Sequence, residues 1–229
     1  MQIALVSLLS TWGINPSSVV GHSSGEIAAA FAAGLLDLPS WMALAYYRGV
    51  AASEIQGSEK VPAGAMMAVG ADYNCVEPLL ESLQSGFAVV ACFNSPDSVT
   101  ISGDRSAVEE LASMLEEKGG FHRMLKVDVA YHSDHMLGGA KGYLNNIAPI
   151  LERYPAATPK ATMFSSVSGL AVTPKMARSP WYWVSNLINP VQFSTALGTM
   201  ASAQELHSQD GSITLVEIGP HATLGSPIR

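Results

Sequence analysis

Apolar runs of the kind that form β-strands alternate along the chain with segments whose apolar residues recur at helical spacing. This alternation predicts the α/β fold class, with a mainly parallel sheet in its core. We expect core helices over residues 2–12, 27–36, 41–53, 134–153 and 193–206, and core strands at 19–20, 161–167 and 213–218. The first of these, 2–12, is expected to be a buried helix that Gly13 and Pro16 end.

A polar break at residues 57–62 separates this pattern from a second one. Between residues 62 and 127 the segments follow in the order β-α-β-β-α-β, which is typical of a ferredoxin-like unit. The expected strands are 65–69, 87–93, 99–102 and 122–127, and the expected helices are 76–83 and 107–118. We therefore predict an α/β core of residues 1–61 and 128–229, with residues 62–127 inserted as a small ferredoxin-like (α+β) subdomain.

The clearest chemical signal is Gly21-His22-Ser23-Ser24-Gly25, a Gly-x-Ser-x-Gly sequence between a predicted strand and a predicted helix. This is the setting of a nucleophile elbow, where a sharp turn exposes a serine hydroxyl. Gly21 and Gly25 are expected to let the strand and the helix approach closely. The N–H groups at the start of the helix would face Ser23 and suit a developing oxyanion. The alternative is a turn of small residues that only packs the helix on the sheet.

A histidine suited to acid–base chemistry follows the inserted segment. His132 is expected on a loop between a strand and a helix that Asp134 can cap. Histidine takes up and returns protons near neutral pH, so His132 is a candidate general base. His132 and His135 could also suggest a metal site, but no third ligand with suitable spacing is evident, and no metal is predicted. A hydrogen-bonded structural histidine is the alternative.

Arg48 lies inside the predicted helix 41–53, among Ala45, Tyr46, Val50 and Ala51. An arginine in so apolar a setting needs an anionic partner. The residues alone favour a structural ion pair, or a side chain whose charged end reaches the surface.

The composition argues against several classes of partner and location. The formal net charge is −7 and no basic cluster stands out, which argues against nucleic acid. No run of about eighteen apolar residues predicts a membrane helix, and the N-terminus lacks the features of a signal peptide. Cys75 and Cys92 lie in apolar stretches without metal-ligand spacing, so we expect two buried thiols and a cytoplasmic location.

Taken together, the motifs resemble those of the acyltransferase domain of type I polyketide synthases, in wording closest to the fungal reducing type. That family is related to the malonyl-CoA:acyl-carrier-protein transacylases of fatty acid synthesis. The matching segments follow in family order along the whole chain. They are Gly-His-Ser-Ser-Gly-Glu at 21–26, Tyr-Tyr-Arg-Gly at 46–49, Gly-Ala-Met-Met-Ala-Val-Gly at 64–70, Asn-Ser-Pro at 94–96, Thr-Ile-Ser-Gly-Asp at 100–104, Ala-Tyr-His-Ser-Asp-His-Met at 130–136, Tyr-Trp-Val-Ser-Asn-Leu-Ile-Asn-Pro-Val-Gln-Phe at 182–193 and Glu-Ile-Gly-Pro-His at 217–221.

The resemblance implies a hydrolase-like α/β core and ping-pong acyl transfer by a Ser–His dyad. Ser23 would attack the thioester of malonyl-CoA, and His132 would act as its general base. Asn186 matches the position whose backbone carbonyl orients the histidine ring. Arg48 matches the arginine that binds the free carboxylate of malonyl, which reverses the interpretation drawn from the residues alone.

The resemblance also implies which residues shape the pocket and which partners it serves. His22 and Tyr131 would line the pocket, and Tyr131 would crowd a branch methyl, which favours malonyl over methylmalonyl. The backbone N–H of Ser24 would supply half of the oxyanion hole. No cofactor would be bound; a coenzyme A thioester is the substrate, and the phosphopantetheine belongs to an acyl carrier protein. Neighbouring polyketide synthase domains are the further expected partners.

One part of the family pattern has no match. The Gly-Gln-Gly motif upstream of the first helix, which supplies the other half of the oxyanion hole, is absent from these 229 residues. This predicts that the chain is truncated at both ends and is a fragment of a longer multidomain enzyme.

Two other functions compete with the transferase. The first is a thioesterase-like serine hydrolase, with His221 as base and Asp128 or Asp134 as the acid. The second is an inactive truncated fragment that serves only as a docking or structural module.

Overall fold

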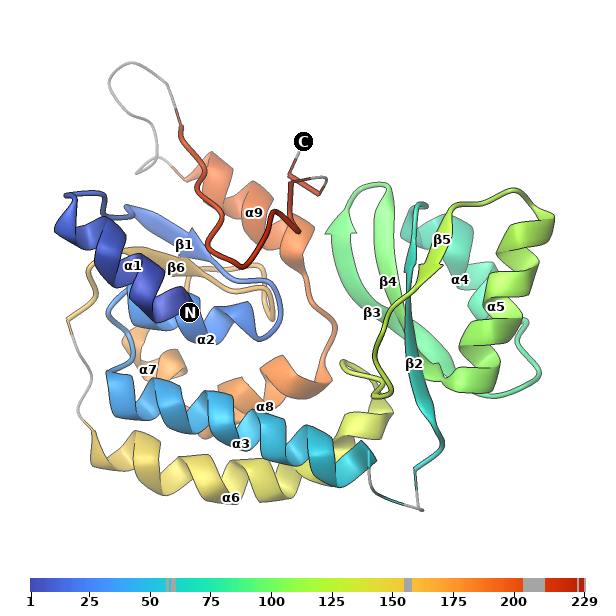
Figure 1. The fold of residues 1–229 in the computed structure, drawn as a ribbon, viewed down its shortest axis with the longest axis horizontal. Coiled ribbons are helices and arrows are strands. Elements are labelled where there is room, and N and C mark those ends of the chain that lie inside the picture. The colour runs from blue at the N-terminus through green and yellow to red at the C-terminus, as the bar shows by residue number, and fades with distance from the viewer. Residues whose placement is uncertain (57, 59–60, 155–157, 204–212, 226, 229) are drawn as a thin grey trace.

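The computed structural model describes residues 1–229 except 57, 59–60, 155–157, 204–212, 226 and 229, and forms two lobes (Figure 1). The core lobe contains α1 (Gln2–Thr11), β1 (Ser18–Val20), α2 (Gly25–Ala32), α3 (Leu38–Gln56), η1 (Asp134–Met136), α6 (Leu137–Arg153), β6 (Thr162–Phe164), α7 (Pro174–Ala177), α8 (Pro180–Ile188) and α9 (Phe193–Ser202). The small lobe contains β2 (Gly64–Val69), α4 (Tyr73–Glu81), β3 (Ala88–Ser95), β4 (Ser98–Asp104), α5 (Arg105–Glu117) and β5 (His122–Met124).

A short parallel sheet of β1 and β6 lies at the centre of the core lobe, with Val19 opposite Met163. Helix α2 follows β1, and α3, α6 and α8 form a layer below it in Figure 1. Trp183, Tyr143 and Leu44 are fully buried in this layer and fill it with large apolar side chains. The predicted α/β class is therefore confirmed.

The small lobe is an antiparallel sheet in the order β3-β4-β2-β5, with α4 and α5 on one face (Figure 1). Side chains alternate across the sheet, so Met67 packs toward the helices while Met66 faces the core lobe. Both faces are thus covered, which explains why β2 is buried almost throughout its length. Its elements follow in the β-α-β-β-α-β order expected for residues 62–127.

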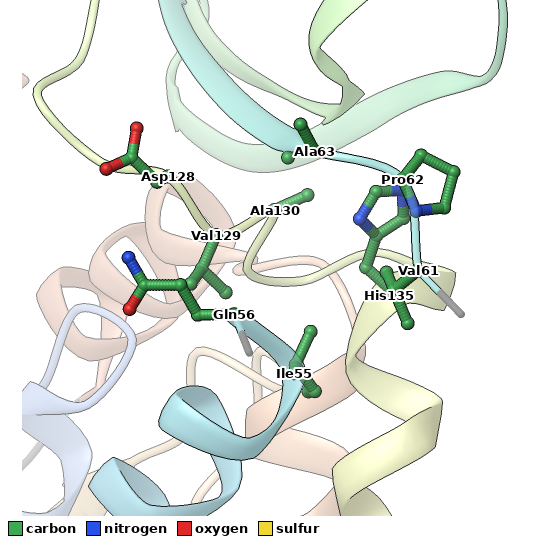
Figure 2. A pocket seen from close by; sticks show the side chains of 10 residues that line it. Ile55, Gln56, Val61, Pro62, Ala63, Asp128, Val129, Ala130 and His135 are labelled. Atoms are coloured by element: carbon green, nitrogen blue, oxygen red, sulfur yellow. The ribbon is translucent and has the colours of Figure 1, made fainter. Parts of the chain in front are cut away.

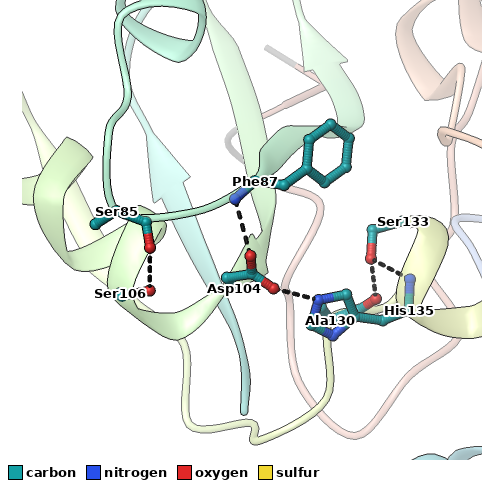
Figure 3. A network of polar contacts seen from close by, with 7 residues as sticks. All are labelled: Ser85, Phe87, Asp104, Ser106, Ala130, Ser133 and His135. Carbon is teal, nitrogen blue, oxygen red and sulfur yellow. Dashed lines mark hydrogen bonds and ion pairs between the residues drawn. The ribbon is translucent and has the colours of Figure 1, made fainter. Parts of the chain in front are cut away.

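The two lobes meet beside the segment that carries His132. The His135 ring nitrogen Nε2 lies 2.7 Å from Asp104 Oδ1, and Asp104 also accepts a hydrogen bond from the Phe87 N–H (Figure 3). A small pocket at the same junction is lined by Ile55, Asp128 and His135, among others (Figure 2). The small lobe is therefore attached close to the catalytic histidine candidate.

Two expectations about the ends of the chain were wrong. Residues 213–218 form no strand, and Ile213 and Val216 are 44% and 57% exposed. An apolar run becomes a strand only when another strand lies beside it to share hydrogen bonds, and the described residues provide none here. Helix α1 forms as predicted but buries no residue, and Trp12 is 65% exposed, because α1 lies at the edge of the core lobe (Figure 1).

Two smaller expectations were also wrong in part, and a third falls partly outside the described residues. Cys92 is buried as predicted, but Cys75 is exposed because it lies on the outer face of α4. Ser133, and not Asp134, caps the turn before α6, since its hydroxyl accepts the N–H of His135. The expected helix from residue 193 is α9, and the part beyond residue 203 lies outside the described residues, as do residues 57, 59 and 60 of the expected break at 57–62.

Candidate active site

Ser23 occupies a sharp turn between β1 and α2. Its φ angle is +54°, in the left-handed region that a residue other than glycine adopts only when its surroundings impose it. Gly21 is required there, because a Cβ atom at this position would lie 2.3 Å from the Glu26 backbone nitrogen. Gly25 is not required, since a Cβ atom would meet nothing within 4 Å, and that expectation was wrong. The turn lifts the Ser23 hydroxyl out of the backbone, as an elbow must.

His132 contacts the Ser23 hydroxyl directly. Its Nε2 lies 2.6 Å from Ser23 Oγ, and its Nδ1 lies 2.9 Å from the backbone carbonyl oxygen of Asn189. A carbonyl only accepts, so Nδ1 carries the proton and Nε2 is free to accept one from the serine. The φ angle of His132 is +60°, so both members of the pair are held in unusual backbone conformations.

The prediction that Asn186 orients the histidine was wrong, and Asn189 does so. Asn186 lies inside α8, where backbone carbonyls point along the helix axis. Asn189 is the residue that ends α8, and its extended backbone (ψ 158°) turns its carbonyl away from the helix toward His132. Val191, two residues later, exchanges backbone hydrogen bonds with the edge strand β3, which fixes this segment in place.

The imidazole of His132 is held as the neutral base. The pKa of His132 is lowered from 6.5 to about 3, mainly by burial and also by the nearby positive charge of Arg48. The hydrogen bond to Asn189 opposes this shift without cancelling it. A neutral imidazole can take the serine proton, so the arrangement fits a general base.

This shift predicts how acyl loading of Ser23 depends on pH. The free base of His132 should persist well below pH 6.5, so the single-turnover loading rate should change less than about twofold between about pH 5 and 8. Below pH 6.5, His132 binds a proton in the unfolded chain but not in the folded one. The free energy of unfolding therefore decreases as the pH falls below 6.5. Circular dichroism should therefore be recorded at each pH, to show that the protein is folded where each rate is measured. Halving of the rate near pH 6.5 in folded protein would contradict the assignment.

Arg48 reaches the same serine from α3. It is 6% exposed, and its Nη2 donates to Ser23 Oγ at 3.3 Å while Nη1 donates to Asn186 Oδ1 at 2.9 Å. Burial lowers the pKa of Arg48, yet a guanidinium stays charged in proteins. No carboxylate forms an ion pair with it in the described part of the chain, so the structural ion pair is absent. A buried cation next to a nucleophile is suited to an anionic substrate.

His22 and Tyr131 flank the serine and the histidine. The Nε2 of His22 lies 2.8 Å from Asn94 Oδ1 of β3, and its ring packs on Phe193 at 5.3 Å between centroids. Tyr131 is half-buried, directly precedes His132 and packs against the apolar clusters of both lobes. Both are neighbours of the dyad in sequence, and their part in lining a substrate pocket stays a prediction.

Ser24 lies at the start of α2, directly after the nucleophile candidate. It is the N-cap residue of α2 and forms no side-chain capping bond. Its N–H belongs to the positive end of that helix, next to Ser23, where an oxyanion would be stabilised.

Glu26 is the site residue that the sequence reasoning missed. It is fully buried on α2, and Oε2 accepts from Tyr182 Oη at 2.8 Å and from Asn186 Nδ2 at 3.0 Å. Oε1 accepts from the Ser166 N–H. The available signal was a lone carboxylate followed at once by the apolar run Ile27–Ala33, since a buried acid must have partners.

The residues of the competing hydrolase are not assembled in this way. His221 is exposed, Asp134 is exposed, and Asp128 pairs with Arg105 at 2.8 Å. A search for three or more His, Cys, Asp or Glu residues able to hold one metal finds no such group in the described part of the chain. His135, the other histidine of the motif, contacts Asp104 instead.

Comparison with known proteins identifies the family. The model of the acyl transferase domain matches residues 1–229, the whole chain. The chain belongs to the acyl transferase domain family. Highly-reducing polyketide synthase 1 of Aureobasidium melanogenum is 49% identical across all of this chain, and partially reducing polyketide synthase men1 of Menisporopsis theobromae is 46% identical. The resemblance to fungal reducing polyketide synthases is therefore confirmed.

The acyltransferase fold is also found in solved structures. The acyltransferase domain from the second module of the salinomycin polyketide synthase matches with a TM-score of 0.80 and 32% identity, over 99% of this chain and 49% of that one. This chain covers only 10% and 9% of the lengths of the two fungal polyketide synthases named above. No helix among its described residues is long and apolar enough to cross a lipid bilayer.

Proposed function

We propose that this acyltransferase moves a malonyl unit from malonyl-CoA to the phosphopantetheine thiol of an acyl carrier protein. The observation that carries the proposal is the buried Arg48 guanidinium, 3.3 Å from the Ser23 hydroxyl and without a carboxylate partner in the described residues. The malonyl group is an acyl group with a second, free carboxylate. A planar guanidinium can bind that carboxylate with two parallel hydrogen bonds.

The first half-reaction follows from the Ser23–His132 contact. His132 Nε2 takes the hydroxyl proton as Ser23 Oγ bonds to the thioester carbonyl carbon. The carbonyl oxygen becomes an oxyanion next to the Ser24 N–H at the start of α2. When the intermediate collapses, the carbon–sulfur bond breaks and the coenzyme A sulfur takes the proton from His132. Malonyl-Ser23 and free coenzyme A remain.

The second half-reaction runs through the same groups. His132 takes the proton of the carrier's phosphopantetheine thiol as the sulfur bonds to the carbonyl carbon of malonyl-Ser23. The carbon–oxygen bond to Ser23 then breaks, and the Ser23 oxygen regains the proton from His132. Asn189 supports both steps, since its carbonyl accepts from Nδ1 and favours the imidazolium that forms each time. No bound cofactor or metal takes part in this scheme.

Tyr131 supplies the selectivity of the proposed pocket. It is half-buried and directly precedes the catalytic histidine, and we propose that a branch methyl on the acyl group would crowd it. Excluding one methyl discriminates by only about 1–3 kcal/mol, so we propose a preference for malonyl over methylmalonyl and not an absolute barrier.

The wider assignment rests on the relatives. We propose that the chain works beside other polyketide synthase domains in the cytoplasm and that residues 62–127 are a ferredoxin-like subdomain of a larger enzyme. The small-lobe strand order β3-β4-β2-β5, with two helices on one face, supports the subdomain proposal.

Transfer to a carrier distinguishes this function from hydrolysis. The complete native polypeptide would be loaded with labelled malonyl-CoA, freed of excess substrate, and mixed with a phosphopantetheinylated carrier protein. Most of the label is expected on the carrier thiol, with little free malonate. Release of the label mainly as malonate, at the same rate with and without carrier, would support the hydrolase.

A further inference from the structure

The buried carboxylate of Glu26 is separated by one residue, Asn186, from the groups that would touch the substrate. Glu26 is fully buried, and its three backbone or side-chain donors come from Tyr182, Asn186 and Ser166. Burial raises the pKa of Glu26, and the hydrogen bonds from Tyr182 and Ser166 act in the opposite direction. A group surrounded only by donors is suited to a carboxylate, which accepts and does not donate.

Asn186 connects this carboxylate to Arg48. Its Nδ2 donates both to Glu26 Oε2 at 3.0 Å and to the Ser23 backbone oxygen at 3.1 Å. Both neighbours of that nitrogen are acceptors, so the amide cannot rotate by half a turn without facing oxygen with oxygen. Its Oδ1 is thereby directed at Arg48 Nη1, 2.9 Å away.

The position of the guanidinium follows from this contact. With Nη1 held by Asn186, the other terminal nitrogen, Nη2, is directed at Ser23 Oγ. Glu26 is not itself paired with Arg48, so no carboxylate of the described residues competes with a ligand for the guanidinium. A carboxylate in direct contact with Arg48 would instead compete with an anionic substrate.

We propose that Glu26 is a positioning residue which, through Asn186, fixes the Arg48 guanidinium in the orientation that accepts the carboxylate of the acyl group. The inference rests on the proposed function and deepens it, because it makes selectivity for anionic acyl groups depend on a residue that never touches them. It assigns Glu26 no part in proton transfer.

The test is Glu26→Gln in the complete native polypeptide. The glutamine side chain is neutral and keeps only one acceptor oxygen, so its NH2 group must face a partner that also donates. The charge-assisted link to Asn186 is thereby weakened with little change in volume. We expect kcat/KM for loading from malonyl-CoA to fall about tenfold, mostly through KM, since a hydrogen bond to a charged group is typically worth that much. Loading from acetyl-CoA, which has no free carboxylate, should change less than about threefold.

Three further variants separate this role from a structural one. Asn186→Ala breaks the same link from the other side and should give the same loss of malonyl preference, even where Glu26→Gln folds poorly. In an Arg48→Ala background, Glu26→Gln should leave the acyl preference unchanged, because both act through one guanidinium. Leu111→Ala, which truncates a fully buried leucine of the small-lobe core, is the control for a general loss of stability and should leave the preference unchanged.

The outcomes distinguish failure of the positioning role of Glu26 from failure of the proposed function. Equal losses with malonyl-CoA and acetyl-CoA in Glu26→Gln and Asn186→Ala would overturn the positioning role, as would an undiminished effect in the Arg48→Ala background. If Arg48→Ala alone leaves acyl preference unchanged, or if the parent protein loads neither donor, the proposed function fails and this inference fails with it.

Discussion

Replacing His132 with alanine is expected to slow acylation of Ser23 by about 10²–10⁴-fold, with less effect on KM for the thioester. The Nε2 of His132 is 2.6 Å from Ser23 Oγ, and its tautomer is fixed by the Asn189 carbonyl. Without this base the serine must attack as a neutral hydroxyl, which is a weak nucleophile. The rate of malonyl-Ser23 formation in a quenched single turnover measures the effect.

His221→Ala is the matched control for that experiment. His221 is exposed, and its late place in the sequence is the one expected of the base in a hydrolase. A transferase should therefore lose activity in His132→Ala only, and a hydrolase in His221→Ala only. The transferase account predicts parental loading in His221→Ala. If acyl-Ser23 forms normally without His132 but not without His221, the assignment of the base is wrong.

Replacing Arg48 with alanine should change which acyl group the enzyme accepts. Loss of a buried, hydrogen-bonded cation should lower kcat/KM for malonyl-CoA by roughly a hundredfold. Acetyl-CoA, with no free carboxylate to bind, should be loaded about as well as before, or better once the unpaired charge is gone. The ratio of the two specificity constants is the quantity to measure.

Arg105→Ala controls for the loss of a positive charge. Arg105 is partly exposed and pairs with Asp128 at 2.8 Å at the junction of the lobes, away from the dyad contacts. It should leave the ratio of malonyl to acetyl loading unchanged. An unchanged ratio in Arg48→Ala would remove the main argument for an anionic acyl substrate.

The residues of the dyad could be predicted from sequence because their roles depend on local pattern. Gly-x-Ser-x-Gly between a strand and a helix forces the elbow, and a Cβ at Gly21 would collide with the backbone of Glu26. The motif around His132 matched that of the family. The structure then brings Ser23 and His132 together although they lie 109 positions apart in the chain.

The histidine-orienting carbonyl could not be assigned from the motif alone. Two asparagines, Asn186 and Asn189, stand three residues apart, and which one offers a free carbonyl depends on where α8 ends. Helix ends are uncertain by one or two residues even in structures, so the pattern gave no basis for choosing between them. Asn186 proved to have a different role, through its side chain.

The remaining differences come from tertiary context. Residues 213–218 have the composition of a buried strand, but the described chain gives them no neighbouring strand. Residues 2–12 have apolar side chains around the whole helix, so the pattern predicts α1 without saying which face is covered. The apolar run after Glu26 indicates that its carboxylate is buried, but the three donors that bind it are brought together only by folding.

The most direct test is the mass of the protein after reaction with malonyl-CoA. The complete native polypeptide would be mixed with labelled malonyl-CoA, quenched in acid, digested, and mapped by mass spectrometry. The account predicts one malonyl group on the peptide that contains Ser23, and none in Ser23→Ala. Absence of the adduct from the parent protein, or its persistence in Ser23→Ala, would contradict the account.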